Sequence, residues 1–133
     1  MGIFDFIFKK DATVSMRFIQ SDNYRGFKKF ALVNYGHKES EKGLKKLHSK
    51  TKNFDLKGME IEIRDFVYDN NKHGVAVYVD ACQVGSYFDN GDFDLAAQLR
   101  AHRISAAYVR IDTIKNMGKE RFAALLFVRL EAK

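Results

Sequence analysis

Hydrophobic and polar residues alternate with a period of two along most of the chain, the pattern of strands that bury one face. In residues 58–68, for example, Met59, Ile61 and Ile63 fall on one face and charged residues on the other. This alternation, or a short β-branched run, predicts about six or seven strands. The segments are residues 13–20, 27–35, 58–68, 74–79, 83–88, 104–114 and 121–130.

Short polar connections join these segments. Asp80 and Ala81 separate the fourth and fifth segments, which predicts a tight hairpin. A second hairpin is predicted around residues 115–119, where Gly118 can adopt a positive φ. The first two segments are joined through the polar residues 21–23.

Two segments without this alternation predict short helices. The first, residues 40–48, has a capping-type start at Ser40. The second, residues 92–103, has Asp92 in its first turn and Arg103 at its end, which suits the helix dipole. Strands that greatly outnumber helices exclude a doubly wound α/β fold. We predict a mainly β (α+β) protein, a small OB-like antiparallel β-barrel.

Size and composition fit one domain. The chain has 133 residues, 46% of them hydrophobic and 14% aromatic, which is enough for a single core. We expect one domain over residues 13–133, preceded by a short amphipathic segment, residues 1–12. In a helical turn the apolar residues of that segment would share one face and dock on the domain or on a second copy. They are Ile3, Phe4, Ile7 and Phe8.

The sequence predicts a cytoplasmic protein. The N-terminus lacks the basic start and small-residue cleavage site of a signal peptide. No apolar run approaches the length of roughly 18 residues that a membrane span needs, so we expect no integral membrane association.

Charge is unevenly distributed. The net charge is +6, but residues 1–57 carry a net +7, residues 58–99 a net −6 and residues 100–133 a net +5. Segregated positive charge is typical of a polyanion binder, and a lysine-rich solvated face explains it equally well. The densest basic stretch comprises Lys42, Lys45, Lys46, Lys50 and Lys52.

The middle of the chain carries short motifs in a fixed order. The segment Leu56-Lys57-Gly58-Met59-Glu60-Ile61-Glu62-Ile63 comes first and is similar to the pattern L-x-G-x-x-V-x-L, with isoleucine at the Val and last Leu positions. A polar turn at residues 68–73, the strand Gly74-Val75-Ala76-Val77 and the segment Gln83-Val84-Gly85-Ser86-Tyr87 follow. This order resembles the HIRAN domain family, over about residues 27–130.

The resemblance implies an OB-like barrel that binds single-stranded DNA, in some members at a free 3′ end. Family members often sit beside helicase-like motors, so the implied partners are nucleic acid and a larger DNA-processing protein. In the family the polar turn usually reads N-P-Y-D-x-N, and Asp69, Asn70 and Asn71 stand at its Pro, Tyr and Asp positions. Ser86 stands where the family has an aromatic residue or histidine. Both departures fall where family members contact DNA, which leaves end recognition open.

Single-strand binding requires a basic groove and exposed aromatic rings for base stacking. The candidate rings, each near a turn or strand end, are Tyr35, Tyr68 and Tyr87. The candidate phosphate contacts are Arg25, Lys28, Lys29, His37, Lys38, Lys72 and His73. Asn70 and Asn71 could read base edges or a terminal hydroxyl. The structural alternative is that Asn70, Asn71 and His73 only form a turn and that each tyrosine is half-buried.

Catalysis finds little support in the sequence. Cys82 has no histidine near it, and the four histidines lack metal-ligand spacing. We therefore expect no enzyme, no cofactor and no metal.

Two functions remain open. A single-stranded DNA or DNA-end binding module would bind oligonucleotides in a salt-sensitive way. A protein-interaction or oligomerisation module would instead form a stable dimer that is weakened by removal of residues 1–10.

Overall fold

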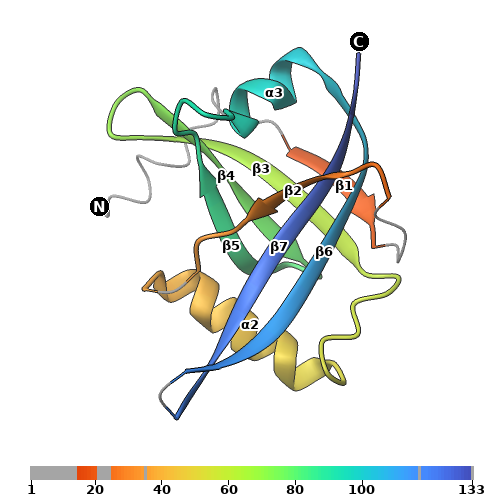
Figure 1. Ribbon diagram of the computed structural model, residues 1–133, viewed down its shortest axis with the longest axis vertical. Helices are drawn as coiled ribbons and strands as arrows, with labels where there is room; N and C mark the ends of the chain where they lie inside the picture. The colour runs from red at the N-terminus through yellow and green to blue at the C-terminus, as the bar shows by residue number, and fades with distance from the viewer. Residues whose placement is uncertain (1–14, 21–24, 35, 117, 133) are drawn as a thin grey trace.

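The computed structural model describes residues 15–20, 25–34, 36–116 and 118–132, and these form a mainly β fold, as the sequence predicts (Figure 1). The described part of the chain contains seven strands and two helices. In order they are β1 (Ser15–Ile19), β2 (Lys28–Ala31), α2 (Lys38–Lys50), β3 (Glu60–Tyr68), β4 (Lys72–Val79), β5 (Cys82–Phe88), α3 (Leu95–Ala101), β6 (Arg103–Asn116) and β7 (Lys119–Glu131). The predicted amphipathic segment, residues 1–12, lies outside the described residues.

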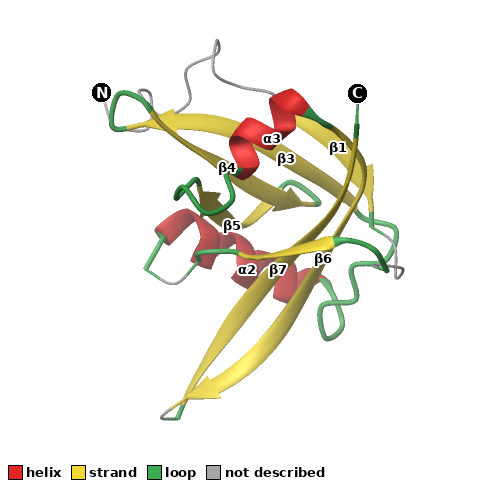
Figure 2. Ribbon diagram, turned by 45° about the horizontal axis from the view of Figure 1, so that its top comes forward, coloured by secondary structure: helices red, strands yellow, loops and turns green. Residues whose placement is uncertain are grey.

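The strands form two antiparallel sheets. One has the order β1-β3-β4-β5 and the other the order β2-β7-β6. β1 and β2 follow one another in the chain yet belong to different sheets. Figure 1 shows α3 near the top of the molecule and α2 near the bottom, and in Figure 2 the β6–β7 hairpin extends beyond the body.

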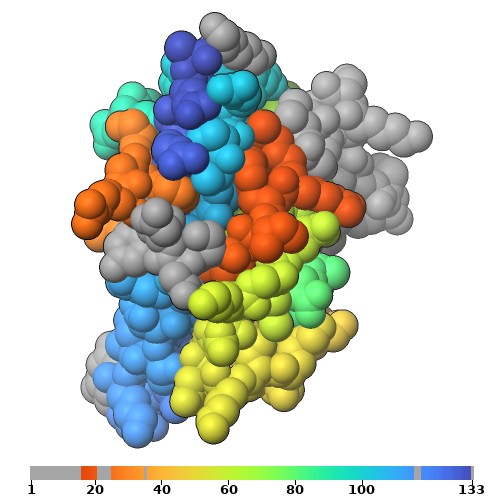
Figure 3. Space-filling view, turned by 90° about the vertical axis from the view of Figure 1, so that its right-hand side faces the viewer, coloured from red at the N-terminus to blue at the C-terminus, as the bar shows by residue number. Residues whose placement is uncertain are grey.

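Contacts link the two sheets at both edges. The Val33 N–H donates to the Ser86 carbonyl at 2.7 Å, and the Ser86 N–H donates back at 2.9 Å, which joins β5 to the segment after β2. At the other edge Gln20, which follows β1, is bonded to Val109 of β6 through its side chain. In the space-filling view β1 lies between β6 and β3 (Figure 3).

A single hydrophobic core lies between the sheets. Ile61 and Ile63 of β3 and Leu126 of β7 have no exposed surface, which confirms the inward face predicted for residues 58–68. Leu44 and Leu47 of α2 belong to the same core.

Both predicted hairpins are confirmed. Asp80 and Ala81 connect β4 and β5 with φ of 49° and 66°, the positive values that a two-residue hairpin turn needs. Gly118, with φ of 77°, lies in the β6–β7 turn. Cys82 is the first residue of β5 and is buried.

The helix starts differ from the sequence prediction. α2 begins at Lys38 with His37 as N-cap, so Ser40 is not a cap but a fully buried residue inside the helix. α3 begins at Leu95, after Asp92. Its first turn is bonded by Asp89, whose Oδ1 accepts from the Ala96 N–H at 3.0 Å.

α2 packs directly against β5. A Cβ atom built on Gly43 would lie 2.0 Å from the carbonyl oxygen of Gln83, so only glycine permits this approach. Near the end of the helix, the Lys50 ammonium lies 2.7 Å from the Asp80 carboxylate, and this hydrogen bond raises the pKa of Lys50. These contacts hold one face of α2 against the sheet. The neighbouring face of the helix therefore lies over the outer surface of the sheet.

Candidate nucleic-acid interface

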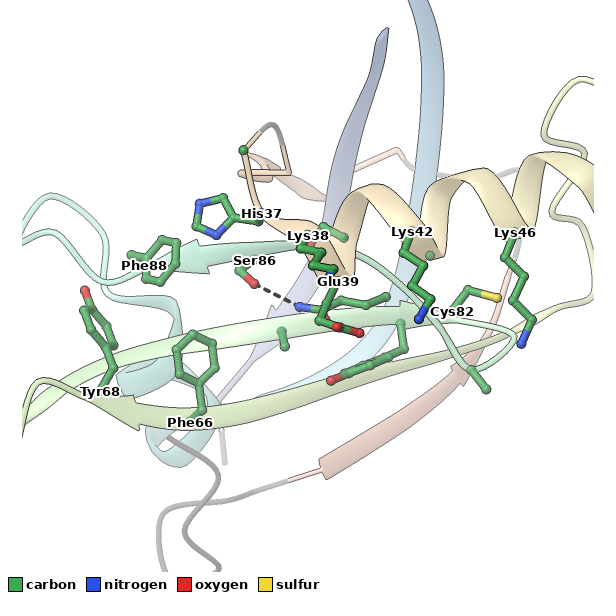
Figure 4. Close-up of a pocket in the computed structure, with 17 residues that line it drawn as sticks. His37, Lys38, Glu39, Lys42, Lys46, Phe66, Tyr68, Cys82, Ser86 and Phe88 are labelled. Carbon is green, nitrogen blue, oxygen red and sulfur yellow. Dashed lines mark hydrogen bonds between the residues drawn. The ribbon is translucent and has the colours of Figure 1, made fainter. Parts of the chain in front are cut away.

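A groove of about 780 Å³ lies between α2 and the outer face of the four-stranded sheet (Figure 4). The strand pleat creates this face, because β3 turns Ile61 and Ile63 into the core and the residues that alternate with them to the other side. The same alternation places Phe66 and Tyr68 in the groove. β4 and β5 complete its floor.

The floor of the groove is rich in aromatic rings. Phe66 and Tyr68 come from β3, Tyr78 from β4 and Phe88 from β5. The Phe88 ring packs edge-on against both β3 rings, with centroids 5.9 Å from Phe66 and 5.2 Å from Tyr68. Tyr68, Tyr78 and Phe88 are half-buried, so part of each side chain faces solvent.

Glycine makes room for this aromatic group. Gly74 of β4 lies opposite Phe66, and a Cβ atom there would come within 2.8 Å of the Phe66 ring. On the same face the Arg64 guanidinium lies 4.6 Å from the centroid of the Tyr78 ring, a cation–π contact. Arg64 does not itself line the groove, and its guanidinium also pairs with the Glu62 carboxylate at 3.1 Å, so it buttresses the Tyr78 ring rather than adding net charge to the floor.

The wall of the groove carries positive charge. Lys38, Lys42 and Lys46 recur every fourth residue of α2, so their side chains follow one face of the helix about 6 Å apart. All three are exposed. At the start of the helix the His37 ring lies 6.0 Å from the Phe88 ring. Figure 4 shows Lys42 and Lys46 reaching from α2 over the groove.

Both tyrosines of the floor are neutral at physiological pH. Burial raises the pKa of Tyr68, and the neighbouring carboxylates of Asp69 and Asp89 raise it further. Burial is also the main cause that raises the pKa of Tyr78. Neutral phenol rings offer a stacking surface and a hydroxyl without repelling an anion.

Polar groups occupy the middle of the groove. The Gln83 side-chain amide donates to the Ser86 hydroxyl at 3.4 Å, and both side chains line the groove. The Glu39 carboxylate enters from the first turn of α2. These groups can donate to or accept from a planar polar ligand lying on the aromatic floor.

Three of the residues selected from the sequence line the groove: His37, Lys38 and Tyr68. The exposed residues Asn70 and Asn71 lie in the turn that follows Tyr68, and the exposed Lys72 is the first residue of β4; none of the three lines the groove. The Lys72 ammonium is 3.9 Å from the Asp69 carboxylate. His73 is half-buried at the start of β4.

The remaining selected residues are elsewhere. Tyr87 donates its hydroxyl to the Phe93 carbonyl at 2.9 Å and packs against the core. The Lys28 ammonium lies 5.0 Å from the centroid of the Phe93 ring, and Lys29 is exposed on β2. Arg25 precedes that strand. None of these four lines the groove. Tyr35 lies outside the described residues.

Sequence reasoning missed much of the floor and wall. Phe66, Tyr78 and Phe88 were not selected, although Phe66 and Tyr68 share one face of β3 by simple alternation. Lys42 and Lys46 were recognised only as part of a basic stretch. Their spacing from Lys38 was the signal that they share its helix face.

No group of three or more histidine, cysteine, aspartate or glutamate side chains suited to a metal ion occurs among the residues that the structure describes. In the same part of the chain no helix is long and apolar enough to span a membrane. Comparisons with family models, with curated proteins and with solved structures found no match to this chain.

Proposed function

We propose that this protein is a single-stranded nucleic-acid binding module and that the strand lies in the groove between α2 and the sheet. One observation carries the proposal: a row of three lysines on α2 faces an aromatic floor across an open groove. Phosphates would lie along the lysines while bases stack on the floor. This is the combination that sequence-tolerant single-strand binding requires.

The spacing of the wall suits a polynucleotide. Lys38, Lys42 and Lys46 repeat about every 6 Å along the helix, a step comparable to that between successive phosphates of an extended strand. Stacking of one base on Tyr68 or Phe88 would contribute about 1–3 kcal/mol. The salt-sensitive lysine contacts would supply the rest of the affinity.

We further propose that the two sheets are the halves of a small OB-like barrel of the HIRAN type, in a cytoplasmic protein. The linkage of the sheets through Val33 and Ser86 and through Gln20 and Val109 supports the barrel. The family assignment rests on the sequence motifs. It suggests DNA as the ligand, with a free 3′ end as the specific target, and a binding role without catalysis.

The experiment is fluorescence anisotropy with short labelled single-stranded DNA, titrated at several salt concentrations. The test variant combines Lys42→Glu with Lys46→Glu. The control combines Lys45→Glu with Lys52→Glu, which changes the net charge equally at exposed lysines that do not line the groove. We expect the test variant to bind more weakly and its salt slope to fall by about two. The control should retain most of the affinity.

If the two variants lose affinity equally, the binding is nonspecific attraction by net charge and the groove is not the binding site. Absence of binding to the wild type at low salt would overturn the proposal. A second oligonucleotide with a blocked 3′ end tests the end-recognition role, because only an end-specific site loses affinity when the terminal hydroxyl is capped.

A specific observation also favours the alternative, self-association. Ile19 of β1 is 63% exposed and lies with Phe18 and Phe27 around a hollow of about 250 Å³ between β1 and β6. If a second copy covers this surface, Ile19→Lys should convert a dimer to a monomer in sedimentation analysis. A wild type that sediments as a monomer excludes this role.

A further inference from the structure

Among the described side chains that line the lysine-walled groove, Glu39 is the one carboxylate. Successive residues of a helix are rotated by about 100°, so around α2 the order is Lys38, Lys42, Lys46, Glu39 and then Gly43. Gly43 is the point at which the helix touches Gln83. Glu39 therefore lies below Lys38 and Lys42, nearer the floor of the groove.

The surroundings of Glu39 leave its carboxylate open to a ligand. It makes no ion pair with the side chains that the structure describes, and it is exposed. Its charge acts on Tyr78 in the floor. Figure 4 shows Glu39 descending from the start of α2 toward the sheet, between Lys38 and Lys42.

We propose that Glu39 reads the base edge of the bound strand and selects bases that carry an exocyclic amino group, cytosine over thymine among the pyrimidines. This inference rests on the proposed function of the groove. The phosphates avoid the carboxylate and lie along the lysine row, which turns the bases toward Glu39. A carboxylate only accepts hydrogen bonds, so it can pair with the N4 amino group of cytosine. The O4 atom of thymine is also an acceptor, so the carboxylate cannot pair with it.

A purely structural role for Glu39 predicts something different. An acidic residue in the first turn of a helix interacts favourably with the helix dipole, and Glu41 occupies the same turn. Glu41 does not line the groove. Glu41→Gln is therefore a matched control that removes the same charge from the same turn.

The test compares labelled oligo(dC) and oligo(dT) of equal length by anisotropy at low salt and neutral pH, for the wild type, Glu39→Gln and Glu41→Gln. Both substitutions alter exposed side chains, so the variants are expected to fold. The wild type should bind oligo(dC) about fivefold to tenfold more tightly than oligo(dT). Glu39→Gln should bring the ratio close to one, because glutamine can also donate to thymine O4. Glu41→Gln should leave the ratio unchanged.

Two outcomes would overturn the inference while the groove remains a binding site: equal wild-type affinity for both oligonucleotides, or a ratio that Glu39→Gln does not change. Absence of binding to either oligonucleotide would overturn the proposed function together with it. The failures of the two proposals are thus distinguishable.

Discussion

The side-chain amide of Gln20 bonds to both backbone groups of Val109, a residue 89 positions away in the chain. Its Nε2 donates to the Val109 carbonyl at 2.5 Å, and its Oε1 accepts from the Val109 N–H at 3.0 Å. This is the pair of bonds that a neighbouring strand would provide. One side chain therefore substitutes for a step of strand pairing between the end of β1 and β6.

Gln20→Ala should lower the free energy of unfolding by about 2–4 kcal/mol. The substitution leaves the N–H and the carbonyl of the buried residue Val109 without the partners that Gln20 provides. Urea unfolding followed by circular dichroism measures the change. Gln20→Leu restores most of the volume without the bonds. If Gln20→Leu recovers the stability, the cavity rather than the hydrogen bonding explains the effect, and this reading of the contact is wrong.

The contact of Gly43 with Gln83 makes a second prediction. Gly43→Ala would gain about 1 kcal/mol of intrinsic helix stability. However, its new methyl group would meet the backbone oxygen of Gln83, which cannot turn away as a side chain can. We expect a net destabilisation of about 1–3 kcal/mol, measured by urea unfolding. Lys45→Ala, at an exposed position of the same helix, should change stability by less than about 0.5 kcal/mol. A stabilised Gly43→Ala variant would contradict the close packing of α2 on β5.

The strands and hairpins could be predicted because their signals are local. Alternation defines a strand from its own residues, and Asp80 and Ala81 define a turn from two. The assignment of strands to sheets could not be predicted in this way. β1 and β2 are consecutive, yet the contact that places β1 beside β6 joins Gln20 to a distant residue.

The candidate site was predicted in part for the same reason. Tyr68 follows the regular alternation of β3, and Lys38 lies beside His37 at the start of α2. Tyr87 and Phe88 are adjacent in β5 but face opposite sides of the sheet, and a register shift at Val77/Tyr78 interrupts the pairing of β4 with β5. The approach of α2 to the sheet depends on a glycine contact that composition does not reveal.

A third prediction concerns the stacking surface. Tyr68→Ala should weaken single-strand binding by about 1–3 kcal/mol, because it removes an aromatic surface of the groove floor. Tyr68→Phe keeps the ring and should bind nearly as well as the wild type. Tyr108→Ala is the control, since Tyr108 is a half-buried ring of the other sheet that packs on Phe127. Anisotropy with short oligonucleotides measures all three. Equal losses for Tyr68→Ala and Tyr108→Ala would indicate a general loss of structure.

Asp65 of β3 and Arg100 of α3 link the two elements, with Asp65 buried and Arg100 exposed. The side chain of Asp65 has no exposed surface, and its Oδ2 accepts a hydrogen bond from the Arg100 guanidinium. Burial raises the pKa of Asp65, and the opposing attraction of Arg100 and His73 does not cancel that effect. The folded protein therefore binds the proton of this carboxyl more tightly than the unfolded chain does. Ionisation of Asp65 consequently costs folding free energy.

The pH dependence of stability tests this conclusion. As pH rises from about 4, where an unfolded aspartate ionises, through the higher folded pKa, the unfolded state releases its proton first and the free energy of unfolding falls. Asp65→Asn removes that decline but retains the size of the side chain. The urea midpoint of Asp65→Asn should therefore rise relative to the midpoint of the wild type as pH increases across this range. Asp112→Asn, at an exposed position of β6, should follow the wild type. If the wild type instead gains stability over Asp65→Asn with rising pH, the attraction of Arg100 outweighs burial and the sign of the shift is wrong.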